Sequence, residues 1–186
     1  MTQNLIQHYE KHGAKIIARS DDGVTLALTT SSHFTPRDNA ALAALGETVA
    51  LAPRMKWLKV ATDDIDRMGD QMNIAGAELE NFRRNPQYIW MHGLTMEPIH
   101  TLGRIVRLVQ TNHTLYALAE YAPEGSSALA DKVFALDAKG YLPANSIGFR
   151  PIEWTPNDTG GYTFTKWELL EVSKVELPAN AGAVDE

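Results

Sequence analysis

The sequence predicts an α+β fold, with an antiparallel β-barrel-like core or curved sheet surrounded by a few helices. From about Met55 onward, strand-like segments alternate with short stretches that contain the turn-forming residues Gly, Pro and Asn. One segment alone, Ser126–Lys139, has clear helical periodicity, and the strands do not alternate with long helices. A chain of 186 residues, 44% hydrophobic and 22% charged, is long enough for one well-filled core. These observations favour a single main domain.

Residues 1–54 are expected to form an N-terminal extension with a hairpin and a short helix. Ala14–Arg19 and Val24–Thr29 are short β-like runs, and the Asp-Asp-Gly sequence between them is typical of a hairpin turn. Pro36 to Gly46 is rich in alanine, and it has proline and glycine where a helix begins and ends.

The next segments are expected to open the main domain. Met55–Ala61 alternates in polarity, and Gln87–Met91 is apolar and aromatic, as in a buried strand. Between them, the run that follows Gly76 and stops before Pro86 has the composition of a short helix. We therefore expect two strands joined through a helix.

The second half of the main domain is expected to be a hairpin, a helix and two further strands. Gly103–Gln110 and Thr114–Tyr121 flank a three-residue turn and should pair antiparallel. Ser126–Lys139 carries a serine at the N-cap position and a glycine just beyond its end. Ser146–Trp154 and Tyr162–Val175 have the character of strands around a turn rich in Pro, Asn and Gly. The domain is expected to span residues 55–180, with a flexible tail at 181–186.

Composition excludes several classes of protein. With 17 basic and 23 acidic residues, the net charge of −6 argues against nucleic acid as a main partner. The absence of cysteine excludes disulfides, thiolate zinc sites, iron–sulfur clusters and cysteine nucleophiles. There is no GxGxxG or P-loop motif, so no nucleotide cofactor is predicted. No apolar run reaches membrane-spanning length and no signal peptide is evident, which predicts a soluble chain without a membrane partner.

Two kinds of histidine chemistry remain open. A metal-dependent hydrolase using His92, His100 and His113 is weakly indicated, because their spacing matches no common zinc motif, and no metal is predicted. Serine hydrolysis needs a hydroxyl, an imidazole and an orienting group, but seven serines and six histidines leave the pairing undetermined. Ser146 beside Gly148, and His92 after an apolar strand, occupy plausible strand-end positions. The alternative is that Ser146 is a strand residue next to a bulge glycine.

Two acids lie in the last predicted strand. Strict alternation places Leu169, Glu171, Ser173 and Val175 on one face and Glu168 on the other. An acid that shares a face with apolar residues tends to be partly buried and to need a partner, which favours Glu171 over Glu168 as a functional acid. A solvated or salt-bridged strand residue is the alternative.

Four ordered blocks resemble the tailed-bacteriophage prohead serine proteases, a capsid-maturation family. The blocks are DDIDRMGDQMNIAGAELENFRRNPQYIWMHG, PIHTLGRI, ALADKVFALDAKGYLPANSIGFRPIEW and WELLEVSKVELPANAGA. Together they cover roughly residues 60 to 183. The resemblance implies a distant relationship with herpesvirus assemblins, and hence an antiparallel barrel wrapped by helices.

The resemblance also implies a function and site residues. It implies a serine endopeptidase inside the procapsid, in the host bacterial cytoplasm, that cleaves scaffold or the scaffolding segment of the major capsid protein, and often itself. By position, Ser146 is the nucleophile and His92 the general base. Assemblins use a second histidine as third member, whereas the matching block here offers only Glu171, which we favour, and Glu168. A catalytically inactive capsid assembly or scaffolding protein with the same fold is the alternative, and self-association is possible.

Overall fold

The computed structural model describes residues 16–20, 23–28, 40, 42–47 and 53–177. Ten strands in these ranges form one mixed sheet in the order β1-β2-β9-β10-β6-β7-β8-β3, with β4 and β5 paired to β10. The strands are β1 (Ile16–Ser20), β2 (Gly23–Leu28), β3 (Met55–Thr62), β4 (Gln71–Met72), β5 (Ala77–Glu78), β6 (Gln87–Trp90), β7 (Thr101–Gln110), β8 (Thr114–Tyr121), β9 (Asn145–Pro156) and β10 (Tyr162–Lys174).

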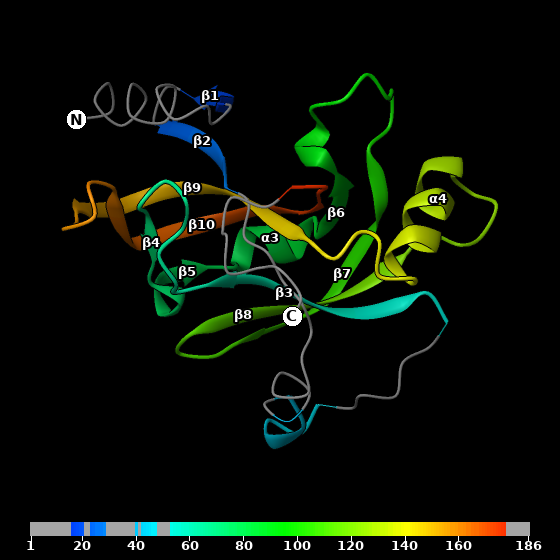
Figure 1. The fold of residues 1–186 in the computed structure, drawn as a ribbon, viewed down its shortest axis with the longest axis horizontal. Helices are drawn as coiled ribbons and strands as arrows, with labels where there is room; N and C mark the ends of the chain where they lie inside the picture. The colour runs from blue at the N-terminus through cyan, green and yellow to red at the C-terminus, as the bar shows by residue number, and fades with distance from the viewer. Residues whose placement is uncertain (1–15, 21–22, 29–39, 41, 48–52, 178–186) are drawn as a thin grey trace.

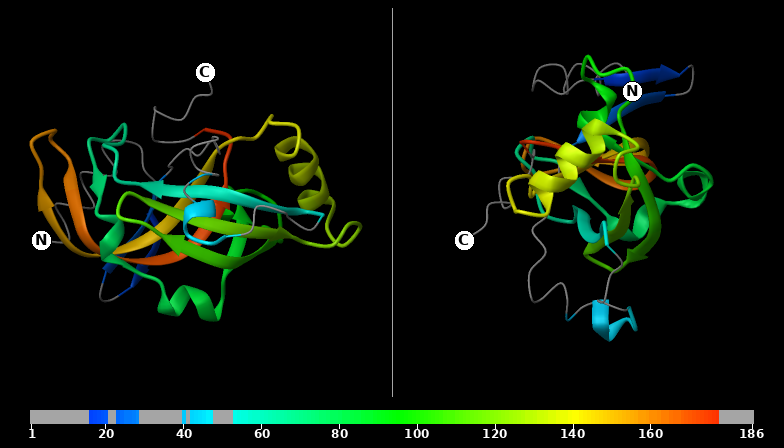
Figure 2. Two further views of the ribbon diagram at one scale, coloured as in Figure 1. Left: turned by 90° about the horizontal axis from the view of Figure 1, so that it is seen from below. Right: turned by 90° about the vertical axis from the view of Figure 1, so that its right-hand side faces the viewer.

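The sheet curls on itself, so the predicted α+β class with a barrel-like core is confirmed. Strands β3 and β9 are distant in the strand order but in contact across the molecule. The interior is filled by apolar side chains that include Tyr88, Phe149, Trp167 and Leu169, all 0% exposed. Figures 1 and 2 show the long strands β9 and β10 running through this curled sheet, with α4 (Ala128–Asp137) at one end.

The hairpins and the longest helix predicted from sequence are present. Strands β7 and β8 pair antiparallel, as do β1 and β2. The side chain of Ser127 accepts a hydrogen bond from the Ala130 amide and so caps α4, while Gly140 has a φ of +79° just after the helix. Residues 40 and 42–44 are helical within the predicted Pro36 to Gly46 segment, the rest of which lies outside the described residues except for 45–46.

The helix expected after Gly76 is shorter than predicted. Residues 77–78 instead form β5, which pairs with β10, and helix α3 spans only Glu80–Arg84. Pairing to an existing strand supplies the backbone hydrogen bonds of Ala77 and Glu78, which overrides their local helix propensity. Among the helices of the described residues, none is long and apolar enough to cross a membrane.

Candidate active site

Three strands bring the predicted site residues together. Strand β10 lies between β6, to which it is parallel, and β9, to which it is antiparallel. Ser173 of β10 is therefore flanked by Ile89 on one side and by Ser146 on the other. The chain leaving β6 reaches His92 three residues after Ile89, so His92 and Ser146 approach Ser173 from its two sides.

An irregularity in the β9–β10 pairing decides which side chains face the site. Leu169 is paired with Phe149, but Glu171 is already paired with Gly148, so β10 has one extra residue here. Adjacent residues of β9 point to opposite faces, and therefore Leu169 faces the core while Glu171 faces away from it. The strict alternation expected from sequence is wrong at this point, because it placed Leu169 and Glu171 on one face.

His92 lies in an unusual turn after β6. Met91, His92 and Gly93 have φ angles of +49°, +57° and +66°, all in the left-handed region. This conformation costs roughly 1–2 kcal/mol for a residue with a Cβ atom, and such positions cluster at functional sites. The amide N–H of His92 donates to Ser173 Oγ at 3.1 Å, which ties the turn to β10.

Glu171 and Ser173 hold the His92 ring. The Nδ1 atom of His92 lies 2.6 Å from Glu171 Oε1, and the Ser173 hydroxyl donates to Glu171 Oε2 at 2.5 Å. The side chains of His92 and Glu171 are 6% and 13% exposed, so water screens this pair little. Both carboxylate oxygens are thus engaged, and the carboxylate cannot rotate without losing a contact.

The second ring nitrogen of His92 is left without such a contact. His92 Nε2 is buried and has no hydrogen-bond partner among the described residues. A carboxylate only accepts hydrogen bonds, so the Glu171 contact places the proton of a neutral imidazole on Nδ1. Nε2 is then the basic nitrogen, buried and available to accept a proton.

Ser146 shares the sheet face of Glu171 and Ser173. It lies directly opposite Ser173 in the antiparallel pairing, where side chains on one face have Cβ atoms about 4.5–5.5 Å apart. Its exposed fraction is 0%. The structure therefore brings Ser146, His92 and Glu171 to one side of β10, with Ser173 between them.

Gly148 makes room for the Glu171 carboxylate. It is paired with Glu171 across β9 and β10, and a Cβ atom added at Gly148 would lie 2.5 Å from Glu171 Oε1. Contact this close is prohibitive unless the carboxylate moves. The glycine of the Asn-Ser-Ile-Gly-Phe segment is thus required by close approach rather than by backbone angle.

Glu168 lies on the same face as Glu171 but has other partners. Arg150 contacts Glu168 Oε2 through Nε at 2.8 Å and Nη2 at 2.6 Å, and Asn81 donates to Oε1 at 2.7 Å. Both of its oxygens are occupied by side chains that are not among the candidate site residues. The structure places Glu168 in an ion pair and Glu171 against His92.

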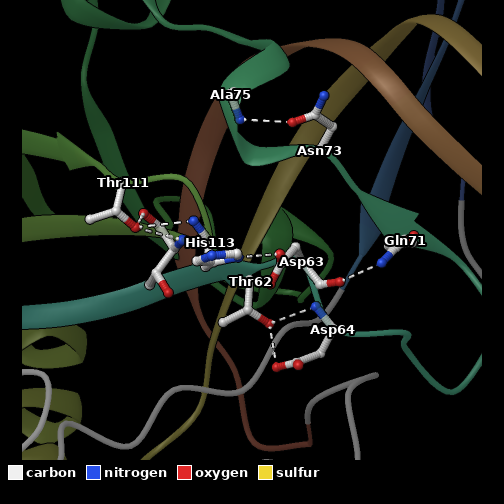
Figure 3. A network of polar contacts seen from close by, with 9 residues as sticks. Thr62, Asp63, Asp64, Gln71, Asn73, Ala75, Thr111 and His113 are labelled. Carbon is white, nitrogen blue, oxygen red and sulfur yellow. Dashed lines mark hydrogen bonds and ion pairs between the residues drawn. The ribbon is translucent and has the colours of Figure 1, made fainter.

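The side chains of the other two histidines of the metal hypothesis have other partners. Figure 3 shows His113 at the β7–β8 turn, where its Nδ1 is 2.6 Å from Asp63 Oδ2 and its amide donates to Thr111 Oγ1. His100 Nδ1 lies 3.2 Å from Thr95 Oγ1. No group of three or more potential ligands that could hold a metal ion occurs in the part of the chain that the structure describes.

Sequence reasoning missed the contributions of Ser173 and Gly148 to this arrangement. Ser173 is two residues from Glu171 in a strand, and that spacing alone places both side chains on one face. The spacing signal was present in the Glu-Val-Ser sequence. The contact of Gly148 with Glu171 depends on the pairing register, and no local signal predicts it.

Comparisons with known proteins agree with this architecture. Residues 97–186 match the family model of the caudovirus prohead serine proteases, a range that includes Ser146 and Glu171 and begins after His92. No curated protein sequence matches the chain significantly. Among solved structures, the chain is similar to the capsid assembly protease gp21 of bacteriophage T4, with a TM-score of 0.56 and 14% identity over 83% of this chain and 98% of that one. The resemblance to the caudovirus prohead serine proteases is therefore confirmed, in sequence over residues 97–186 and in fold by the T4 structure.

Proposed function

We propose that the chain is a serine endopeptidase of capsid maturation in which Ser146 is the nucleophile, His92 the general base and Glu171 the orienting acid. The observation that carries this proposal is the state of the His92 ring. Glu171 fixes it through Nδ1, while Nε2 is buried and has no partner among the described residues. A carboxylate on Nδ1 and an Nε2 atom that can accept a proton are two of the features that the base of a serine protease needs.

The proposed reaction uses these three side chains in turn. Ser146 Oγ attacks the carbonyl carbon of the scissile peptide, and its proton passes to His92 Nε2. The imidazolium is stabilised by Glu171, and it returns the proton to the leaving amine as the peptide C–N bond breaks. Water then attacks the acyl-enzyme ester while His92 Nε2 takes its proton. The ester C–O bond breaks, and His92 returns the proton to Ser146 Oγ. Ser146 is fully buried, so the cycle requires the surrounding chain to open for the peptide.

Capsid components are the proposed substrates. The family match and the T4 capsid assembly protease support a role in prohead maturation. We propose that the chain cleaves scaffold or the scaffolding segment of the major capsid protein, and also itself, inside the procapsid in the host bacterium.

The test is intact-mass analysis of the capsid and scaffold proteins after co-expression with this chain. The Ser146→Ala and His92→Ala variants should leave both proteins whole, whereas the wild type should remove defined segments. Ser126→Ala and His113→Ala are matched controls, since both residues are exposed and lie away from β10, and they should process normally. Capsid proteins that stay whole with the wild type, in particles that still assemble, would instead identify an inactive assembly factor.

A further inference from the structure

A second set of polar side chains lies inside the fold, behind the candidate site. Asp137, the last residue of α4, is 1% exposed, and Lys174, the last residue of β10, is 0% exposed. Lys174 follows Ser173 directly, so its side chain projects from the opposite face of β10, into the interior. It is paired there with Asn145, the residue before Ser146.

Asp137 is the centre of this set. Its Oδ1 atom accepts hydrogen bonds from Lys174 Nζ at 3.0 Å and from Lys56 Nζ at 2.6 Å. Its Oδ2 atom accepts from the Tyr121 hydroxyl at 2.8 Å, and that hydroxyl lies 3.1 Å from the hydroxyl of Tyr88. The contacts form a continuous buried chain from Tyr88 through Tyr121 and Asp137 to Lys174.

The two ends of this chain lie beside the candidate site residues. Tyr88 is on β6, four residues before His92, and Lys174 follows Ser173 on β10. Lys174 Nζ also donates to the carbonyl of Leu142, in the connection that leads into β9 and Ser146. The buried chain therefore links all three elements that carry Ser146, His92 and Glu171.

The electrostatics show that the interior strongly perturbs these groups. Burial lowers the pKa of Lys174 to about 8, with Asp137 opposing and Lys56 adding to this effect. Burial disfavours the charged form of Asp137, but Lys174 and Lys56 outweigh it and lower the pKa of this carboxyl. Buried ion pairs are often less stabilising than well-packed apolar side chains of similar volume, so stability alone is a poor reason for this arrangement.

We propose that Asp137 is a positioning residue, which acts through Lys174 and Tyr121 to fix β6, β9 and β10 relative to one another for the reaction at Ser146. This inference rests on the proposed function. It concerns residues that do not touch substrate, and it predicts an effect on turnover rather than on substrate binding.

The sharpest variant is Tyr121→Phe, which removes one hydroxyl and preserves the ring. Loss of this link should lower kcat roughly tenfold and change KM less than twofold on a capsid-derived peptide substrate. Lys174→Met should have the same or a larger effect. Lys56→Met is the matched control, because it removes an ion pair to the same Asp137 oxygen from β3, a strand that carries no site residue. It should leave kcat unchanged.

Hydrogen–deuterium exchange gives a second readout that does not need activity. In folded Tyr121→Phe and Lys174→Met proteins, the amides of residues 90–93 and 142–146 should exchange at least tenfold faster than in wild type and in Lys56→Met. Wild-type kcat and exchange in Tyr121→Phe and Lys174→Met would overturn the positioning role. If the wild type cleaves nothing, the proposed function fails. Amide exchange at residues 90–93 and 142–146 then decides by itself whether the buried contacts from Tyr88 to Lys174 hold these two segments in place.

Discussion

Glu168 and Glu171 lie three residues apart on β10 and face the same side of the sheet, yet they have different environments. Glu168 is bound by Arg150 and Asn81, whereas Glu171 is bound by His92 and Ser173. Glu168 is the more buried of the two side chains, at 8% against 13% exposure. Burial therefore does not identify the functional acid. The partner does, since an arginine neutralises a carboxylate permanently while a histidine can exchange its proton.

The largest effect that separates the two acids is expected from Glu171→Gln. The neutral glutamine side chain cannot stabilise the His92 imidazolium. Its NH₂ group can also donate to Nδ1, which favours the tautomer with the proton on Nε2, so kcat/KM should fall on the order of 10³-fold or more. Glu168→Gln should retain most activity and lower the free energy of unfolding by about 1–3 kcal/mol, through the weakened Arg150 contact. Peptide cleavage rates and urea unfolding measure the two effects. The reverse ranking in activity would transfer the orienting role to Glu168.

Gly148→Ala should disturb Glu171 without removing it. The added Cβ atom would lie 2.5 Å from Glu171 Oε1, so the carboxylate must leave its position against His92. Misplacement of an orienting group by about 1 Å costs up to roughly 10²-fold in rate. Gly125→Ala is the control for loss of stability alone. Its φ of +81° strains an alanine, but no atom lies within 4 Å of the added Cβ, so it should unfold more easily and keep its turnover. A fully active Gly148→Ala protein would contradict the close approach.

A smaller effect is expected from Ser173→Ala. The substitution removes the hydroxyl that donates to Glu171 and accepts from the His92 amide. Loss of one hydrogen bond to a charged group corresponds to roughly a tenfold decrease in kcat, with Glu171 still present to orient the ring. Steady-state kinetics of Ser173→Ala, Glu171→Gln and the double variant would show whether the Ser173–Glu171 and Glu171–His92 contacts act together. If they do, the decrease in kcat of the double variant should be smaller than the product of the two single decreases.

The last prediction concerns the pH dependence of stability. The pKa of Lys174 is lowered from 10.5 to about 8 in the folded protein, so between these values the unfolded chain binds more protons at this group. Its contribution to the free energy of unfolding therefore rises with pH over that window. Burial raises the pKa values of Tyr88 and Tyr121 well above 10.0, and these groups act in the opposite direction above pH 10.

Urea unfolding between pH 8 and 10 measures this difference. The wild type should gain stability over the interval relative to Lys174→Met, in which the titrating group is absent. Parallel pH curves for the two proteins would show that Lys174 titrates normally and is not the buried cation described above. Turnover of the wild type should fall as the pH rises above 8. The Lys174 ammonium group, which bridges Asp137 and the Leu142 carbonyl, loses its charge there.

Local patterns in the sequence were sufficient for most of the secondary structure. Alternating polarity predicted β3, and two strand-like runs around a short turn predicted the β7–β8 hairpin. Helical spacing of apolar residues, with a serine and a glycine at the two ends, predicted α4. These features depend on neighbours within a few residues, so the sequence carries them directly. The candidate residues Ser146 and His92 came from strand-end positions and from the family resemblance, since spacing alone could not pair a serine with a histidine.

The tertiary structure decided the features that depend on pairing between distant segments. One extra residue in β10 places Glu168 and Glu171 on one face, which no inspection of β10 alone would show. The same register puts Gly148 against Glu171, and it sends Lys174 inward to an aspartate 37 residues away. The sequence by itself determined which residues favour strand, turn and helix. Only the assembled sheet decided which of them meet, because the face that a side chain occupies is set by the register of the neighbouring strand.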